Sequence, residues 1–397
     1  MRVLMISDVF FPRVNGVSTS IQTFRHDLAA RGCETWLVAP QYPERWQDDA
    51  RVLRQPSRYL AFDPEDRMMK SRPSLAACLA LAGKVDVLHV QTPFVAHWLG
   101  IKAARALRVP VVETYHTFFE EYLHHYVPLL PASIARALAR TFSRRQCNAV
   151  DAVVAPSRQL ADVLERYGVA RRIETIPTGL NLDEFEHGDG AAFRARFGIA
   201  ADRPVMLLVG RVAHEKNIGF LLRVLGEVVL RVPEALLVIA GEGPALAGLR
   251  RAAADAGLAN QVLFVGYLDR RGPLLDCYRA ADVFVFASRT ETQGLVLLES
   301  LALGVPVVST AVLGTKEVLA NAAGAVVVQE DVAEFAAAVT RVLTEPALRA
   351  KLASAGREFV EQHWSSREMA RRLLQLYEEL VRTRRVDSTT TRYDSAA

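Results

Sequence analysis

The stretch VFVFASRTETQGLVLLES (283–300) sets a run of β-favouring apolar residues, a polar loop with one glycine and an apolar helical segment directly after one another. A strand this apolar is buried on both faces, which is typical of a parallel sheet covered by helices. Similar runs, each followed by a segment with helical periodicity, recur along nearly the whole chain. They lie at 2–7, 35–40, 85–91, 109–115 and 152–157, and again at 205–210, 235–241, 262–266, 305–310 and 324–328. The pattern predicts an α/β protein with two doubly wound parallel sheets.

A stretch rich in Gly and acidic residues, IPTGLNLDEFEHGDG (176–190), separates the two sets of runs. We therefore predict a first domain over 1–190 and a second over 191–364. Residues 365–381 have a helical pattern, whereas 382–397 lack apolar periodicity and are predicted to be disordered.

Composition excludes several classes of protein. The chain has 397 residues, 51% of them hydrophobic, and a net charge of +4, which excludes global disorder and gives no sign of a nucleic-acid surface. The four cysteines are widely spaced, which favours a reducing compartment over a disulfide scaffold or zinc site. The start MRVLMISDVF lacks the features of a signal peptide, and no apolar run approaches the roughly 18 residues of a membrane span. We expect a soluble or membrane-peripheral, cytoplasmic protein.

In open α/β sheets, ligands bind at the carboxyl ends of the strands. After the run at 283–288, Glu291 lies in the loop, Gly294 begins a helix and Glu299 follows inside it. A carboxylate accepts two hydroxyl donors at once, which suits a sugar or ribose. The amides of Gly294, Leu295 and Val296 lie between the two acids and can bind an anion. The alternative is an ordinary helix-end charge and an exposed glutamate.

After the run at 205–210 come Arg211 and Lys216, two cations close to a predicted helix start, where backbone amides already favour a phosphate or diphosphate. They could instead be solvated surface charges. The turn G-E-G-P, which contains Gly241 and Glu242, is either a plain turn or a close approach of backbone to ligand. The chain lacks G-x-G-x-x-G and the P-loop motif, which argues against a dinucleotide dehydrogenase and a P-loop NTPase. It also lacks a D-x-D after a strand, so these cations would neutralise a diphosphate without a metal.

In the first half, Asn15-Gly16 forms a turn signal, and Ser18 or Thr19 could cap the helix that follows. An ordinary strand-to-helix turn explains these residues equally well. His116 follows the run at 109–115 and could bind a sugar hydroxyl or transfer a proton, unless it is a structural histidine.

Segment 130–147 predicts an amphipathic helix with an arginine face, of the kind that can lie on anionic lipid. A surface helix with a solvated face is equally compatible. The apolar positions, one helical turn apart, are Leu130, Ile134, Leu138 and Phe142, and the arginines are Arg136, Arg140 and Arg144. Just before the segment, His124, His125 and Tyr126 could shape an acceptor wall.

Taken together, Glu291-x7-Glu299, Arg211-x4-Lys216, the G-E-G-P turn and I-P-T-G-L-N at the domain join resemble the retaining glycosyltransferases of family 4 over residues 1 to about 380. The resemblance implies the GT-B fold, in which two Rossmann-like domains face a central cleft. It also implies that the helix at 365–381 crosses back onto the first domain.

The resemblance implies a role for each candidate residue. Glu299 would hold the ribose hydroxyls and Glu291 the transferred sugar. Arg211 and Lys216 would hold the diphosphate with the amides of 294–296. The remaining donor-side and sugar-side positions are Gly241 and Glu242 in the turn, Gly266, Tyr267 and Leu268 beside the base, and Gly16 and His116 in the first domain.

Two positions depart from the pattern: the first loop has the single Gly16 where many relatives have two glycines, and Gln293 stands where many have Phe. The E-T-Q-G form and Y-H-T-F-F-E-E-Y (115–122) resemble the branch that glycosylates diacylglycerol or related lipids. The expectation is thus a retaining hexosyltransferase that moves a sugar from a UDP-glucose-like donor to a lipid, with no cofactor. The alternatives are a GDP-mannose-dependent enzyme, a glycan or small soluble acceptor, and a nucleotide-sugar epimerase.

Overall fold

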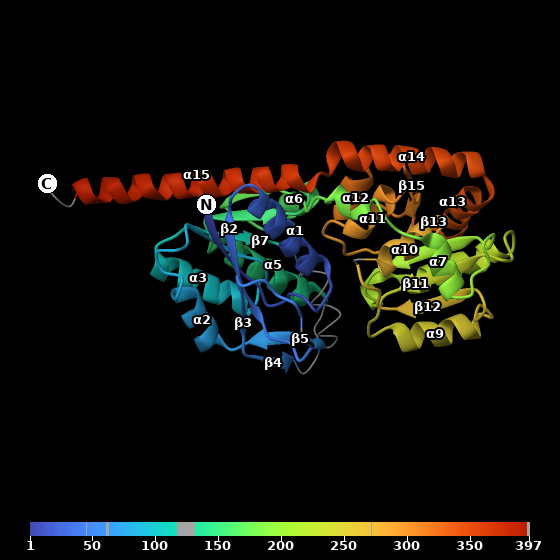
Figure 1. Cartoon of the computed structure of the whole chain (residues 1–397), viewed down its shortest axis with the longest axis horizontal. Coiled ribbons are helices and arrows are strands. Elements are labelled where there is room, and N and C mark those ends of the chain that lie inside the picture. The colour runs from blue at the N-terminus through green and yellow to red at the C-terminus, as the bar shows by residue number, and fades with distance from the viewer. Residues whose placement is uncertain (45, 61–62, 117–131, 271, 395–397) are drawn as a thin grey trace. The chain divides into compact units, whose positions relative to one another are not determined.

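The computed structural model describes residues 1–44, 46–60, 63–116, 132–270 and 272–394. The chain divides into two compact units, Met1–Gly179 with Ser366–Ala397, and Leu180–Ser365. The first division thus falls at Gly179, whereas the sequence led us to expect it after residue 190. Each unit is built on one parallel sheet with helices packed against it (Figure 1).

The first unit contains a seven-stranded sheet in the order β3-β2-β1-β6-β7-β8-β9, in which every pairing is parallel. A two-stranded antiparallel sheet, β4-β5, is an addition that the apolar runs did not predict. The strands are β1 (Arg2–Ile6), β2 (Glu34–Pro40), β3 (Val52–Gln55), β4 (Ser57–Leu60), β5 (Asp63–Met69), β6 (Val87–Val90), β7 (Val111–Thr114), β8 (Ala152–Ala155) and β9 (Arg172–Thr175).

The helices of the first unit come from both ends of the chain. They are α1 (Gly16–Ala30), α2 (Ser71–Leu79), α3 (Val95–Leu107), α5 (Ala132–Asn148), α6 (Arg158–Arg166) and α15 (Ser366–Asp394). Figure 1 shows α15 beside α1, and the two helices are in contact. The return of the C-terminal helix to the first unit is therefore confirmed. The helix continues to Asp394, beyond the end at 381 that we expected.

A buried hydrogen-bonded chain ties α15 to the sheet. The hydroxyl of Tyr377 lies 2.5 Å from Nδ1 of His89, and Nε2 of His89 lies 2.7 Å from the Thr114 hydroxyl. Burial, with a smaller contribution from His116, lowers the pKa of His89 to about 3. The imidazole is therefore neutral at pH 7 and acts as a structural link between α15 and two strands.

The second unit contains a six-stranded parallel sheet in the order β12-β11-β10-β13-β14-β15. Its strands are β10 (Val205–Val209), β11 (Leu236–Ala240), β12 (Val262–Gly266), β13 (Val283–Phe286), β14 (Val307–Ser309) and β15 (Ala325–Val327). Its helices are α7 (Gly190–Arg196), α8 (Ile218–Val229), α9 (Leu246–Asp255), α10 (Pro273–Arg279), α11 (Leu295–Ala302), α12 (Gly314–Leu319), α13 (Val332–Thr344) and α14 (Pro346–His363), with 3₁₀ turns η1 (Leu182–Phe185) and η2 (His214–Lys216). Strands β10, β11 and β13 are wholly buried, as their continuous apolar sequence predicted.

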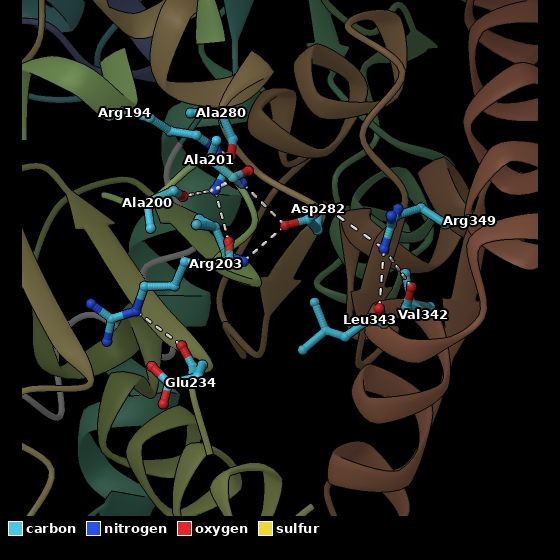
Figure 2. Close-up of polar contacts among 11 residues, drawn as sticks. Arg194, Ala200, Ala201, Arg203, Glu234, Ala280, Asp282, Val342, Leu343 and Arg349 are labelled. Atoms are coloured by element: carbon cyan, nitrogen blue, oxygen red, sulfur yellow. Dashed lines mark hydrogen bonds and ion pairs between the residues drawn. The ribbon is translucent and has the colours of Figure 1, made fainter. Parts of the chain in front are cut away.

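An aspartate fixes the amino end of the second sheet (Figure 2). Asp282, just before β13, accepts hydrogen bonds from the backbone N–H of Val205 at 2.9 Å and from Arg194 at 3.2 Å. The first sheet repeats the device: Asp86 accepts from the N–H of Arg2 and Asp151 from that of Val111, both at 2.8 Å. Each carboxylate satisfies a strand-end amide that has no partner in the ladder. These hydrogen bonds align adjacent strands at their amino ends. The loops that carry the candidate site residues follow the carboxyl ends of the strands.

Candidate functional site

Three loops meet closely at the carboxyl ends of β10, β11 and β12. The N–H of Val212 donates to the carbonyl of Glu242, and that of Gly241 to the carbonyl of Gly266, both at 2.8 Å. A Cβ atom on Gly241 would lie 1.9 Å from the carbonyl oxygen of Gly210, and φ at this residue is +137°. Only glycine fits there. The G-E-G-P turn therefore has a structural explanation, because it packs one loop of the site against its neighbour.

The loop after β13 presents the start of α11 at the same edge of the sheet. Gly294 precedes the helix with φ +87°, and in the described part of the chain no side chain caps α11. The carbonyl of Glu291 accepts a hydrogen bond from the N–H of Gly314 at 3.0 Å, which holds this loop against α12. The amides of Leu295 and Val296 lie in the first turn of α11, where backbone N–H groups favour an anion, and the binding of an anion there stays a prediction.

Glu299 lies inside α11 and is only 1% exposed, so the alternative of an exposed helix glutamate is wrong. Its Oε2 accepts a hydrogen bond from the hydroxyl of Tyr278 at 2.9 Å, and its Oε1 pairs with the guanidinium of Arg270. Burial, and then the charge of Glu299, raise the pKa of Tyr278 well above its usual value, so this hydroxyl keeps its proton and donates. Glu299 is therefore held at both oxygens.

The pair Lys216 and Glu291 forms a second ion pair at this edge. Lys216 comes from η2 after β10 and Glu291 from the loop after β13, and their side chains are 19% and 18% exposed. Another hydrogen bond joins the same two loops, from the hydroxyl of Ser288 to the carbonyl of Glu215 at 3.3 Å. Two residues that we predicted for different parts of one ligand thus contact each other directly. Arg211 lies in the same loop as Lys216 and is half-buried.

The residues predicted to flank a base have different surroundings. The side chain of Tyr267 is exposed, whereas Leu268 is buried in the hydrophobic core of the second unit. Gly266 ends β12 and lies near the carboxylate of Glu242. Of these residues, Tyr267 offers a ring that a planar ligand could contact.

Sequence reasoning missed Arg270 and Tyr278. Arg270 follows Tyr267 in the loop after β12, and Tyr278 lies on α10. The signal that could have found them is the apolar run at 295–298 directly before Glu299, because a carboxylate buried among such residues requires a cation or hydrogen-bond donors. The sequence contains too many arginines and tyrosines for that requirement to select these two.

In the first unit, the prediction that Ser18 or Thr19 caps α1 is wrong. Asn15 is the cap, because its side chain accepts from the N–H of Ser18 at 2.8 Å, while the Ser18 hydroxyl donates to the carbonyl of Arg13. The helix begins at Gly16, so Ser18 and Thr19 already lie inside it, and Asn15 is the residue in the cap position. Gly16 is the first residue of α1, and a Cβ there would meet nothing within 4 Å.

His116 follows β7 at the carboxyl edge of the first sheet. Its Nε2 lies 3.2 Å from the side-chain oxygen of Gln91, and burial lowers its pKa to about 4. The ring is therefore neutral at pH 7 and can donate or accept a hydrogen bond. Asp8, at the end of β1, is a further buried polar residue here, and it accepts from Thr92 at 2.9 Å and from the N–H of Ala96 at 3.0 Å. It therefore caps α3.

The predicted arginine-faced helix is α5, and its predicted apolar positions lie on the exposed side of the helix. On the side that faces the unit, two buried polar side chains form hydrogen bonds: Ser143 bonds to Tyr115 at 2.6 Å, and Gln146 donates to the carbonyl of Pro93. Ala139 and Cys147 are buried on this side as well. The outer side is apolar and basic, with exposed Ile134, Leu138, Phe142, Arg136, Arg140 and Arg144. Leu130 and the acceptor-wall residues His124, His125 and Tyr126 lie outside the described residues.

Comparison with known proteins decides the family. Residues 190–359 match the family Glycosyl transferases group 1, and residues 14–184 match Glycosyltransferase Family 4. The chain is 35% identical to the alpha-monoglucosyldiacylglycerol synthase of Streptococcus pneumoniae over 319 residues, which are 78% of this chain and 71% of that protein. The chain belongs to glycosyltransferase family 4. The resemblance recognised in the sequence is thus confirmed.

Another relative of this glycosyltransferase is named for a different donor and acceptor, and a solved structure supports the fold. A GDP-mannose-dependent alpha-(1-6)-phosphatidylinositol monomannoside mannosyltransferase of Mycolicibacterium smegmatis is 30% identical over 390 residues, 94% of this chain and 97% of that protein. The structure of HepE from Anabaena in complex with UDP and glucose superposes with a TM-score of 0.76 at 16% identity, over 96% of this chain and 100% of that one. These structural likenesses show the GT-B fold.

The described part of the glycosyltransferase lacks both a membrane-spanning helix and a cluster of metal-ligating side chains. None of its described helices is long and apolar enough to cross a membrane. In the same residues, no group of three or more His, Cys, Asp or Glu side chains is arranged to hold a metal ion.

Proposed function

We propose that this glycosyltransferase moves a hexose, with glucose from UDP-glucose favoured, to a lipid acceptor such as diacylglycerol, with retention of configuration and without a metal. One observation carries the donor half: two carboxylates, each paired with a cation from a neighbouring loop, lie at the carboxyl edge of the second sheet beside the start of α11. Hydroxyl acceptors, phosphate-binding cations and helix amides are the groups that a nucleotide sugar requires.

In this proposal, Glu299 accepts the ribose hydroxyls and Glu291 those of the transferred sugar. Arg211 and Lys216 bind the diphosphate together with the amides at the start of α11. As the bond to the sugar breaks, negative charge grows on the departing diphosphate, and cations placed there lower the barrier. The acceptor hydroxyl attacks from the face that the diphosphate leaves, and the leaving phosphate takes its proton. Neutral His116 would hydrogen-bond a sugar hydroxyl.

The acceptor half rests on α5. Its inner side is held by hydrogen bonds, while Ile134, Leu138 and Phe142 are exposed, as are Arg136, Arg140 and Arg144. A helix with exposed apolar and basic residues suits a surface of anionic lipid, where the apolar side chains enter the boundary and the arginines meet headgroups. Relatives from Streptococcus pneumoniae and Acholeplasma laidlawii, both named alpha-monoglucosyldiacylglycerol synthase, support this acceptor. We propose that the enzyme works from the cytoplasm, at the inner face of the cell membrane.

Vesicle flotation combined with product analysis tests the proposal. The protein is mixed with phosphatidylglycerol vesicles that contain diacylglycerol, and with neutral phosphatidylcholine vesicles that contain the same amount. With UDP-glucose we expect binding to the anionic vesicles and formation of monoglucosyldiacylglycerol. L138D should lose most of the binding and keep its melting temperature, because Leu138 is 53% exposed. Failure to bind either vesicle would refute the lipid surface.

A GDP-mannose-dependent enzyme is the second candidate, because the mannosyltransferase match covers nearly the whole of both chains. Thermal shifts with UDP, UDP-glucose, GDP and GDP-mannose separate the two, since a ligand stabilises the folded protein according to its affinity. A larger shift with GDP and GDP-mannose overturns the UDP assignment. Transfer only to a glycan or a soluble sugar overturns the lipid acceptor, and an isomerised nucleotide sugar formed without any acceptor indicates an epimerase.

A further inference from the structure

We propose that Arg270 is a positioning residue: it holds the Glu299 carboxylate in one orientation and so makes the donor site selective for ribose over deoxyribose. The inference rests on the proposed function, in which Glu299 receives the ribose hydroxyls. It adds a residue that neither the motif nor the predicted site contained.

The surroundings of Glu299 show why the carboxylate needs such a residue. Its neighbours on α11, Leu297, Leu298 and Leu301, are buried in the hydrophobic core of the second unit. A carboxylate at this depth is costly unless it is both paired with a cation and hydrogen-bonded. Glu299 has one partner of each kind in the described residues, Arg270 at Oε1 and Tyr278 at Oε2.

The two partners differ in their access to solvent. Tyr278 is fully buried on α10 and is fixed by the core, with its ring stacked 5.8 Å from that of Phe284. Arg270 comes from the loop between β12 and α10, and its side chain is 26% exposed. Arg270 therefore approaches Glu299 from the solvent-facing side of the site, from which a ligand would also come.

Holding both oxygens fixes the directions in which Glu299 can accept further hydrogen bonds. Each carboxylate oxygen has two lone pairs, so a donor on each leaves one acceptor direction at each oxygen. A pair of vicinal hydroxyls can use both directions, whereas a deoxyribose leaves one of them empty. Without Arg270 the Glu299 carboxylate could rotate about its side-chain bonds. The site would then distinguish ribose from deoxyribose less well.

Other arginine–glutamate pairs of the second unit lack these features. Arg341 and Glu345 pair on the surface of α13, with side chains 65% and 47% exposed. Such a pair contributes little to stability and orients no buried group. R341A is therefore the matched control, because it also removes an arginine from a glutamate but leaves Glu299 untouched.

The test measures the affinity of the full chain for UDP, GDP and their 2′-deoxy and 3′-deoxy forms by calorimetry. The quantity that decides is the ratio of affinities for the ribose and deoxyribose forms. We expect the unmodified protein and R341A to prefer ribose by about tenfold, the effect of one hydrogen bond to a charged acceptor. R270A and Y278F should lower the ratio severalfold. R270A added to E299Q should change the ratio no further.

The outcomes distinguish a failure of the positioning role from a failure of the proposed function. If R270A weakens ribose and deoxyribose forms equally, the ratio is kept, the positioning role is refuted and the proposed function stands. If the unmodified protein binds no nucleoside diphosphate, the proposed function itself fails. If it binds them without preferring ribose, the role of Glu299 fails, and the inference with it. If R270A does not fold, R270K decides: lysine keeps the charge but not the planar fork, so a lowered ratio supports the inference and an unchanged one overturns it.

Discussion

Replacing Lys216 by alanine should lower kcat by about 10²–10³ and leave the protein folded. Lys216 pairs with Glu291, and with 19% exposure its side chain lies at the edge of the site and outside the core. Removing one group that stabilises charge in a transition state raises the barrier by about 2.7–4 kcal/mol. Glu291 is 18% exposed, so water can solvate its carboxylate when the lysine is gone, and stability should change by no more than about 1 kcal/mol.

Steady-state transfer kinetics with the donor that gives the largest thermal shift provide the measurement. K351A is the matched control, because Lys351 is exposed on α14, and it should show unchanged kinetics. The double variant K216A with E291Q should lose less activity than the product of the single losses, because the two side chains interact. A rise in KM at unchanged kcat in K216A would refute the reasoning, since it would mean that Lys216 binds substrate and transition state equally.

Two further predictions concern the framework. D282A should lower the free energy of unfolding of the second unit by about 2 kcal/mol, because Arg194 and the N–H of Val205 lose their acceptor. D282N should lower it by less. If chemical denaturation shows that D282A is as stable as the unmodified protein, this reasoning is contradicted. Burial lowers the pKa of His116 from 6.5 to about 4 in the folded protein. As the pH falls, the unfolded chain therefore binds a proton at this histidine before the folded chain does. The folded state loses stability for this reason from about pH 6.5 towards pH 4. H116Q should therefore lose less stability than the unmodified protein between pH 7 and pH 4.5; the same loss in both would contradict the burial argument.

The second sheet and five strands of the first could be predicted because these strands lie in continuous apolar runs, whereas β3 (VLRQ) and β9 (RIET) lie in none of the recognised runs. Every strand of the second sheet lies in a run recognised in the sequence, with bounds that differ by a few residues. The hairpin of β4 and β5 could not be predicted, since SRYL (57–60) and DPEDRMM (63–69) contain no such run. Antiparallel strands at the surface can be polar on the exposed face, so their pattern is weaker.

The candidate site also has a part that the sequence predicts and a part that it does not. Glu291, Gly294 and Glu299 lie within one short segment, so their order along a loop and a helix follows from local sequence alone. The partners of the two acids, Lys216 and Arg270, come from other loops, and their contacts depend on strand order. The helix α5 shows a related limit, because its wheel predicts two faces but does not tell which face points to the protein.

The two ion pairs should respond differently to a nucleotide sugar. A diphosphate carries the negative charge that Lys216 now receives from Glu291, so we expect the ligand to replace that carboxylate and leave Glu291 able to accept sugar hydroxyls. Ribose hydroxyls carry no charge, and they cannot replace Glu299 as the partner of Arg270. The pair at Glu291 is therefore expected to open on binding while the pair at Glu299 persists. The site would thus admit a diphosphate by exchanging the partner of one cation, while the sugar hydroxyls donate hydrogen bonds to the Glu291 carboxylate that the lysine leaves.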